Sequence, residues 1–449
     1  MKYGGNSPFS GGHMLRYMKM QRRRFFKTLG GAAGALAAGR ALGMAEKPAA
    51  ALEPDNFTQI PGVLPGDLEA YFTEEKLRET IDTAVSLKGI EFQVVCYNFP
   101  SWHPTPYMEK IFGKGWTEFE TLKNSKPLYA GHLFPKYPLW GYFNEAEPEW
   151  AEKEIETAST YGIDVWMIDW YWHNGTMFYH EQLENGFLKA RNREKLKFAV
   201  MWANHDWSNL YPAVSTGTPA LLLPQLHSED DCLKVIDYCI EHYFHEPNYW
   251  RIDGRLVFSF FSPNHLRKFF TPDQLRRVVD KMRERTARAG LGELHIQASG
   301  EYEGLEGELK HLGFDSATLY HTWGWMKGLR EGTRVPYGVG AVGTIQYWKE
   351  TAAKGALAFY PDCPVGWDSS ARFGPHTVMV FERTPDQYER VMRAAQYFSA
   401  ASPAEPKIIF LSNWNEWTED HVLLPDTIFG YSYLEAVRRL FRANGLKAC

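Results

Sequence analysis

Two glutamates three residues apart form the pattern in this sequence that most directly suggests chemistry. Glu416 and Glu419 lie in the segment WNEWTED, which runs from Trp414 to Asp420. Three residues separate two backbones by at most about 11 Å, so both carboxylates can reach one site. Cleavage of a glycosidic bond needs one acid to protonate the leaving oxygen and one carboxylate to assist on the sugar. We therefore predict that Glu416 and Glu419 are catalytic; the alternative is an exposed loop or a salt bridge.

Eight short apolar runs, most of them followed by a helical pattern, indicate the elements that would position these acids. This alternation predicts a parallel sheet, and its eightfold repetition predicts an α/β fold, a single (β/α)8 TIM barrel over residues 90–449 with a long loop after the first strand. An open doubly wound sheet is the alternative, but no GxGxxG motif follows the first run. The runs are residues 92–97, 165–169, 198–203, 256–261, 294–298, 316–319, 357–360 and 408–412.

Helices between these runs are predicted where apolar residues recur at helical spacing and proline or glycine marks an end. Pro148 stands at the first turn of one such segment, and Gly162 follows its last turn. The predicted helices are residues 148–161, 229–242, 272–289, 303–312, 344–354, 385–400 and 431–443.

Aromatic, amide and acidic side chains follow nearly every run. The loops that leave the C-terminal ends of barrel strands carry function, and such side chains stack on sugar faces and bond sugar hydroxyls. Asp169 is equally compatible with a buried acid paired with a neighbouring strand. The predicted substrate-binding residues are Trp102, His103, Asp169, Tyr171, Trp172, Asn204, His205, Asp206, Trp207, Tyr320, Trp323, Trp367, Asp368, Asn415 and Trp417.

The histidines and cysteines do not indicate a metal site. His103, His173, His205 and His321 stand on different predicted loops without ligand spacing, so we expect hydrogen bonds to a sugar and predict no metal and no cofactor. Five cysteines without a CxxC motif signal neither a disulfide scaffold nor zinc.

Several residues are expected to serve packing. Glu118, in the loop after the first strand, would either line one side of a cleft or belong to a lid that only packs. Cys232 and Cys239 could form at most one bridge. The residues expected in the core are Cys96, Cys363, Trp166, Trp250 and Trp348.

The first 45 residues resemble a twin-arginine signal segment. Arg22 and Arg23 form the pair, and a weakly apolar stretch of glycine and alanine follows. Residues 46–89 are predicted to be a linker and an N-terminal helix at 74–87, and the protein is expected to be exported to the periplasm or the cell exterior. No other segment is long and apolar enough to span a bilayer.

Charge excludes some partners. The first 45 residues contain eight basic residues and no acid, so the remainder has 41 Lys+Arg against 54 Asp+Glu, a net charge of −13. Phosphate binding draws its affinity from clustered Lys and Arg, so we predict no nucleic-acid partner. The 15% content of aromatic residues suits a neutral carbohydrate substrate.

Three blocks of the sequence resemble the glycoside hydrolase family 99-like proteins, which include the WbsX-like group. Together they cover residues 92–440. The first block holds His103-Pro104, GKGWTEF at 113–119, KPL at 126–128 and Gly131-His132; the second holds YGID at 161–164, Tyr171-Trp172 and WAN at 202–204; the third holds WNEW at 414–417, Glu419, Pro425-Asp426 and GYSYL at 430–434.

This resemblance implies a barrel enzyme that cleaves an α-mannoside within a chain with retention. It implies that Glu416 takes the proton from the sugar 2-hydroxyl and that Glu419 acts on the leaving oxygen, through a 1,2-anhydro sugar. Two residues depart from the family pattern: His205 stands where an acid usually follows Trp-Ala-Asn, and Asp420 replaces a glycine. Both positions fall at the predicted site.

We predict a glycoside hydrolase. A glycosyltransferase of polysaccharide biosynthesis is an alternative, which the export signal disfavours because nucleotide-sugar donors are cytoplasmic. A non-catalytic carbohydrate-binding protein is another, which the presence of both Glu416 and Glu419 disfavours.

Overall fold

A nine-segment parallel sheet forms the centre of the fold. The computed structural model describes residues 85–210, 221–320, 332–381 and 383–442. All lie in one unit, residues 54–449. The neighbour order is β12-β10-β9-β8-β4-β2-β1-β16-β13. The strands are β1 (Gln93–Asn98), β2 (Val165–His173), β4 (Lys197–Trp202), β8 (Arg255–Phe260), β9 (Leu294–Ala298), β10 (Ser316–Ala317), β12 (Ala358–Phe359), β13 (Asp362–Pro364) and β16 (Ile408–Ser412).

The two edge strands of this order are consecutive in the chain, and that closes the sheet. β12 pairs with β10, and β13, two residues later, pairs with β16. Between them, the Tyr360 N–H donates to the Ala317 carbonyl, and the Pro361 carbonyl accepts from the Phe410 N–H, both at 2.9 Å. The seventh strand therefore bonds the sixth with its first half and the eighth with its second half. The predicted eight-stranded barrel is confirmed, and every predicted run contains a strand.

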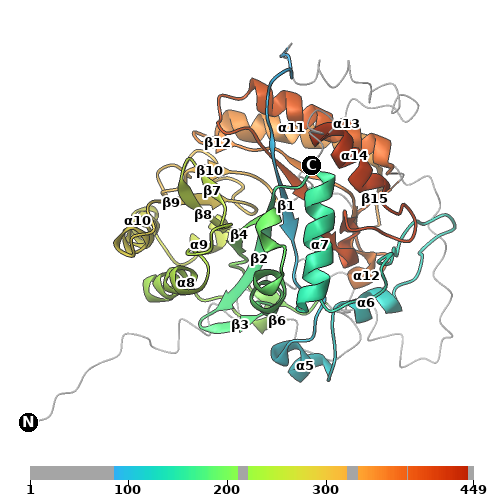
Figure 1. The fold of residues 1–449 in the computed structure, drawn as a ribbon, viewed down its shortest axis with the longest axis horizontal. Coiled ribbons are helices and arrows are strands. Elements are labelled where there is room, and N and C mark those ends of the chain that lie inside the picture. Colours follow the sequence, from blue (N-terminus) through green and yellow to red (C-terminus); the bar gives the residue numbers. More distant parts are fainter. Residues whose placement is uncertain (1–84, 211–220, 321–331, 382, 443–449) are drawn as a thin grey trace, which may run out of the picture. The chain divides into compact units, whose positions relative to one another are not determined.

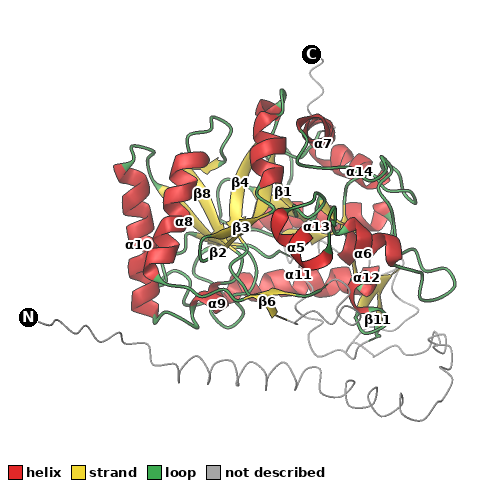
Figure 2. Cartoon of the chain, turned by 90° about the horizontal axis from the view of Figure 1, so that it is seen from below, coloured by secondary structure: helices red, strands yellow, loops and turns green. Residues whose placement is uncertain are grey.

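Helices flank the strands, with α8 beside α10 on one side and α11, α13 and α14 grouped on another (Figures 1 and 2). Local sequence sets their ends. Thr271 and Thr384 each form a capping box, and a proline follows each of them at the first helical position. Gly162 ends α7 in the left-handed conformation. The helices are α7 (Pro148–Tyr161), α8 (Glu229–His242), α9 (Pro263–Leu266), α10 (Pro272–Arg288), α11 (Tyr337–Lys354), α13 (Pro385–Ala401) and α14 (Ser432–Phe441).

One predicted helix is absent, and two predicted elements are longer than expected. Residues 303–312 form successive turns, because Gly304 adopts a φ of +83° that a helix cannot contain. α11 begins at Tyr337, seven residues before the predicted start; its glycine-rich first turns are poor helix formers, but Gly338 and Gly340 are buried, so packing outweighs propensity. β2 continues to His173 because its last residues pair with β3 (Thr176–Phe178).

The N-terminal predictions lie outside the described residues. These are the signal segment, the linker and most of the helix at 74–87. In the described part of the chain, no helix combines the length and apolar character that crossing a bilayer requires. The four described cysteines, Cys96, Cys232, Cys239 and Cys363, are buried thiols without a disulfide.

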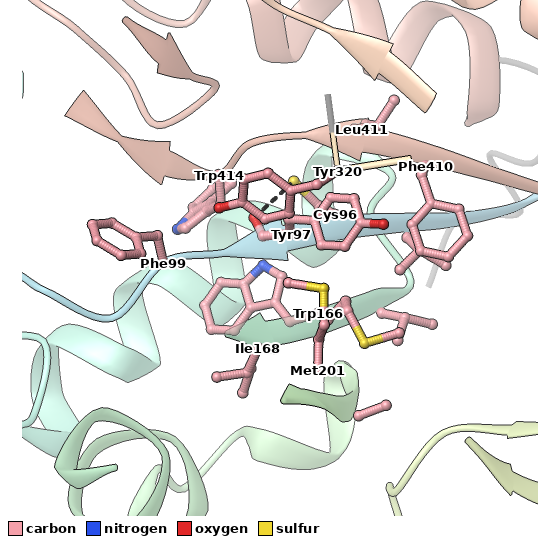
Figure 3. Packing of buried hydrophobic residues seen from close by; sticks show 14 of the residues in the cluster. Cys96, Tyr97, Phe99, Trp166, Ile168, Met201, Tyr320, Phe410, Leu411 and Trp414 are labelled. Carbon is pink, nitrogen blue, oxygen red and sulfur yellow. Dashed lines mark hydrogen bonds between the residues drawn. The ribbon is translucent and has the colours of Figure 1, made fainter. Parts of the chain in front are cut away.

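Aromatic side chains fill the core. Tyr97 packs between Tyr320 and Phe410, with ring centroids 4.7 and 5.3 Å away, and Trp166 packs against Trp414 at 5.7 Å (Figure 3). These contacts join β1, β2 and β16 to the segment after β10. The predicted core residues Trp166, Trp250, Trp348, Cys96 and Cys363 are all fully buried, which confirms them.

Truncation of Phe410 tests this packing. Phe410 is fully buried and contacts Tyr97 and Trp250. Phe410→Ala should lower the free energy of unfolding by about 3–5 kcal/mol, because it removes the transfer free energy of the ring and leaves a cavity. Urea denaturation measures this difference. Ile428→Ala, at a position that is 43% exposed, is the control and should change it little. A loss at Phe410 no larger than at Ile428 would contradict this account of the core.

Candidate active site

A short hairpin places both glutamates beyond the C-terminal end of β16. β17 (Asn415–Glu416) pairs antiparallel with β18 (His421–Val422), and η5 (Trp417–Glu419), a turn of 3-10 helix, connects them. The tight turn brings the two side chains back together. One carboxylate oxygen each from Glu416 and Glu419 and one ring nitrogen of His421 lie within 4.8 Å of one another. The predicted pair therefore converges.

Glu416 lies in a buried hydrogen-bonding environment and is only 5% exposed. Its Oε2 accepts from the Asn413 amide at 2.6 Å and from the Tyr320 hydroxyl at 2.9 Å. Burial raises the pKa of Glu416 well above its ordinary value, and the charge of Glu419 and a hydrogen bond with it raise it further. Burial thus favours the protonated form of the Glu416 carboxyl.

Asp169 lies within β2 and shares the Tyr320 hydroxyl with Glu416. That hydroxyl lies 2.8 Å from Asp169 Oδ2 and 2.9 Å from Glu416 Oε2. A phenol has one proton to donate, so the second contact is a hydrogen bond only if a carboxyl group supplies a proton. Burial also raises the pKa of Asp169 well above its ordinary value. A proton on either carboxyl group would thus satisfy both contacts.

Glu419 has a different environment. Its side chain is 12% exposed and pairs with Nη1 of Arg372, from α12 (Ser370–Phe373). Nη2 of the same guanidinium lies 3.6 Å from Glu416 Oε1 and 2.7 Å from Glu118 Oε1. The salt-bridge alternative from the sequence is thus true of Glu419, and it coexists with convergence of the pair. One arginine contacts both acids unequally.

His421 raises the question of a metal ion, since with Glu416 and Glu419 it offers three donor atoms. The same two carboxylates already face the guanidinium of Arg372. A divalent cation would lie against that positive charge or have to displace it. We assign no metal to these donors.

Most of the predicted aromatic binding residues are packing residues. Trp102 packs on Phe119, the Trp172 indole donates to Asp231 at 2.9 Å, and Trp207 packs on Tyr171. These rings pack inside the protein, and the substrate-binding role predicted for them stays a prediction. The buried rings of the predicted set are Trp102, Tyr171, Trp172, Trp207, Tyr320 and Trp417.

Trp367 is the partly exposed tryptophan among the described members of the predicted set. Its ring packs edge-on against His421, with centroids 6.2 Å apart, so it adjoins the glutamate pair. A stacking role for Trp367 stays a prediction. Trp323 and His321 lie outside the described residues.

The predicted polar binding residues are mostly held by protein partners. His103 bonds Glu145 at 3.0 Å, and Asn415 accepts from the Phe99 N–H at 2.8 Å. Asn204 exchanges two hydrogen bonds with the Ser262 backbone, and Asp368 bonds His132 at 2.6 Å. These residues shape the loops around the pair. His205 and Asp206 are partly exposed, and their contact with a substrate stays a prediction.

Sequence reasoning missed three contributors to the site. Arg372 and Asn413 contact the glutamates directly, and His421 lies beside them. The spacing Glu419-x-His421 could have indicated the histidine. Arg372 comes from a different loop, so no spacing pattern within one segment signals it.

Asp420 explains a departure noted in the sequence. Its φ of +56° is left-handed, a conformation that glycine adopts at lowest cost, which accounts for glycine in resembling proteins. Here the Asp420 carboxylate pairs with Arg383 and lies 3.2 Å from Lys136 Nζ. All three side chains are buried, so the substitution places an anion between two buried cations.

Comparison with known sequences gives a family. A family model described as glycosyltransferase WbsX matches residues 94–437. The WxcX protein of Xanthomonas campestris pv. campestris, described as uncharacterized, is 25% identical over 363 residues, which cover 77% of this chain and 49% of that protein. The chain thus spans about half the length of the curated relatives it matches.

Comparison with solved structures agrees with the barrel. A glycoside hydrolase family 99 endo-α-mannosidase from Bacteroides thetaiotaomicron has a TM-score of 0.51 and 14% identity, covering 79% of this chain and 98% of that one. A structure described as a glycoside hydrolase-like protein has a TM-score of 0.53 and 14% identity, covering 81% and 99%. At this identity the likeness shows a shared fold.

Neutralising Asp420 tests the buried ion cluster. Asp420→Asn keeps a side chain that tolerates the left-handed conformation but removes the charge that Arg383 and Lys136 face. The free energy of unfolding should fall by about 3–5 kcal/mol, because buried cations lose their partner. Asp280→Asn, in an exposed pair with Arg276, should cost under about 1 kcal/mol. Equal losses in the two variants would contradict the cluster's role.

Two buried histidines, His173 and His227, should lower the free energy of unfolding as the pH falls. Burial lowers the pKa of His173 and of His227 from 6.5 to about 3. Between these pH values the unfolded chain binds more protons, so stability falls as pH drops below about 6.5. Each histidine contributes a slope of at most about 1.4 kcal/mol per pH unit. Urea unfolding between pH 7 and pH 4 should be less pH-dependent in His173→Gln and His227→Gln, and unaltered in the exposed control His311→Gln. Identical slopes in all four proteins would refute this.

Proposed function

The chain belongs to the family described as glycosyltransferase WbsX, and from this premise we propose that it is a glycoside hydrolase that cleaves a polysaccharide or glycan with Glu416 and Glu419. The fold it shares with glycoside hydrolases supports a carbohydrate substrate. The observation that carries the proposal is the convergence of two carboxyl groups in unlike surroundings. Glu416 is buried with a raised pKa, and Glu419 is partly exposed and paired with Arg372.

The pair suits the proton transfers of glycoside cleavage. One carboxylate oxygen of Glu416 and one of Glu419 lie within 4.8 Å of each other, close enough for the two groups to share one proton. With that proton on Glu419, the Glu416 carboxylate can take the proton of the sugar 2-hydroxyl. The 2-oxygen of the sugar then attacks the anomeric carbon. Glu419 then protonates the departing oxygen, which leaves a 1,2-anhydro sugar. A water molecule then attacks the anomeric carbon and opens the anhydro ring, while Glu419 takes a proton from the water. Glu416 returns its proton to the sugar 2-oxygen, so both glutamates regain their starting protonation states.

We propose an endo-acting, α-mannosidase-like cleavage with retention as the finer form of this function. The 2-hydroxyl route accounts for retention without a glycosyl ester. His205 and Asp420 are departures from the resembling family and are expected to affect which sugar is bound. Export by the twin-arginine route, which rests on residues 1–45, belongs to the proposal as well.

Glycosyl transfer is the second candidate, favoured by the description of the family model. Incubation of the purified chain with a panel of plant, algal and host glycans separates the two. Release of reducing ends supports hydrolysis, whereas product formation only with an activated sugar donor supports transfer. Binding without products would indicate a carbohydrate-binding protein.

Substitution of each glutamate tests the site. Glu416→Gln and Glu419→Gln should each lower kcat by about 10²–10⁴-fold, because each removes one proton-transfer group. Rates are measured on the glycan that wild type cleaves, with thermal melting to confirm folding. Glu389→Gln, which alters a pair with Arg439 on α13 and α14, is the control and should keep full activity. Undiminished activity in both site variants would disprove the assignment.

A further inference from the structure

A third glutamate, Glu118, binds the arginine of the acid pair. It is fully buried and immediately precedes α6 (Phe119–Asn124). Its Oε1 accepts from Arg372 Nη2 at 2.7 Å and Nε at 3.2 Å, and also from the Thr418 hydroxyl. Its Oε2 accepts from the Ser101 hydroxyl at 2.8 Å. Four donors thus fix the Glu118 carboxylate. None of these hydrogen bonds involves Glu416 or Glu419.

The nitrogens of the Arg372 guanidinium are shared unequally among the three glutamates. Nε and Nη2 of Arg372 bond Glu118, and Nη1 bonds Glu419. Glu416 is left with a 3.6 Å contact to Nη2. One positive charge cannot neutralise the three carboxylates of Glu118, Glu416 and Glu419, so the site is most stable when one of them carries a proton. The acid with the weakest cation contact is Glu416.

We propose that Glu118 is a positioning residue of the glutamate pair: it binds two nitrogens of Arg372, holds the guanidinium on Glu419 and takes up part of its charge, so that less of this charge acts on Glu416. This inference rests on the proposed function in that it concerns the same two acids. It assigns a role to Glu118, for which the sequence allowed two interpretations: lining a cleft, or packing within a lid.

The location of Glu118 supports this role. Three short elements from different loops meet here: α6 follows β1, α12 follows β13 and η5 follows β16. The guanidinium of Arg372 lies 5.9 Å from the Phe99 ring centre, in an apolar setting where charges interact strongly. Burial is the main cause of the raised pKa of Glu416, and the charge of Arg372 opposes it by lowering that pKa, so a change in how Arg372 is held should alter the titration of Glu416.

Opposite effects of two substitutions test the proposal. Glu118→Gln removes an anion but keeps a side chain that accepts from Arg372, so Glu416 should titrate about one pH unit lower. Arg372→Gln removes the cation, so Glu416 should titrate higher. The readout is a pH titration of the full chain with carbon-13-labelled glutamate carboxyls, in which the Glu416 signal is the one lost in Glu416→Gln. A residue that only supports packing would not shift the two variants in opposite directions.

Two further variants serve as controls. Glu118→Asp keeps the charge and should leave the titration of Glu416 close to wild type. If Glu118→Gln fails to fold, Arg372→Gln is compared with Glu118→Asp: an upward shift is expected only in Arg372→Gln, and the same shift in both variants, or none in Arg372→Gln, would overturn the proposal. Asp315→Asn removes a partner of Arg283 at the other end of the barrel and should leave Glu416 unchanged.

The titration needs no substrate, so its outcome is independent of the hydrolase assignment. If a cleaved glycan is found, the alkaline limb of the kcat/KM profile should move to lower pH in Glu118→Gln and to higher pH in Arg372→Gln. Shifts of the same sign in these two variants, or no shift in either, would overturn the proposal. Absence of cleavage by wild type would overturn the proposed function and leave the titration result standing.

Discussion

Closure of the barrel through a divided seventh strand is the constraint on which the site depends. The chain from Ala358 to Pro364 bonds β10 first and β16 afterwards, so β16 lies between β13 and β1. The hairpin that carries Glu416 and Glu419 therefore leaves the sheet beside the ends of the first and seventh strands. Within the closed barrel, Tyr320 from the loop after β10 meets Asp169 of β2, with its hydroxyl 2.8 Å from Asp169 Oδ2.

Burial then determines the chemistry that the acids can perform. Asp169, Glu416 and Tyr320 share hydrogen bonds in a setting that disfavours charge, and burial raises the pKa of both carboxyls. A fully hydrated cluster of this kind would be ionised at neutral pH and would hold no proton to donate. Exclusion of water by the aromatic core under Tyr320 is thus a chemical requirement as well as a source of stability (Figure 3).

The sequence predicted the features that depend on local patterns. Apolar runs identified all eight strands, and the three-residue spacing of Glu416 and Glu419 sufficed to predict that they converge. The failed helix at 303–312 shows the limit of periodicity, since the φ of Gly304 depends on the turn it enters. Composition could not distinguish buried from exposed tryptophans, because both stacking and packing favour the same rings. Arg372 escaped prediction because its contacts join loops that only the closed barrel brings together.

The loop after β13 supplies both arginines that hold the hairpin. Arg372 faces Glu416 and Glu419 on one side, and Arg383 pairs with Asp420, the next residue along. Glycine in the place of Asp420 would relieve the left-handed backbone but leave Arg383 buried without this anion. With aspartate, the left-handed backbone costs of the order of 1 kcal/mol, but the side chain forms buried ion pairs that glycine cannot form. Because both arginines come from one loop, a shift of that loop would move the charges on both sides of the glutamate turn together.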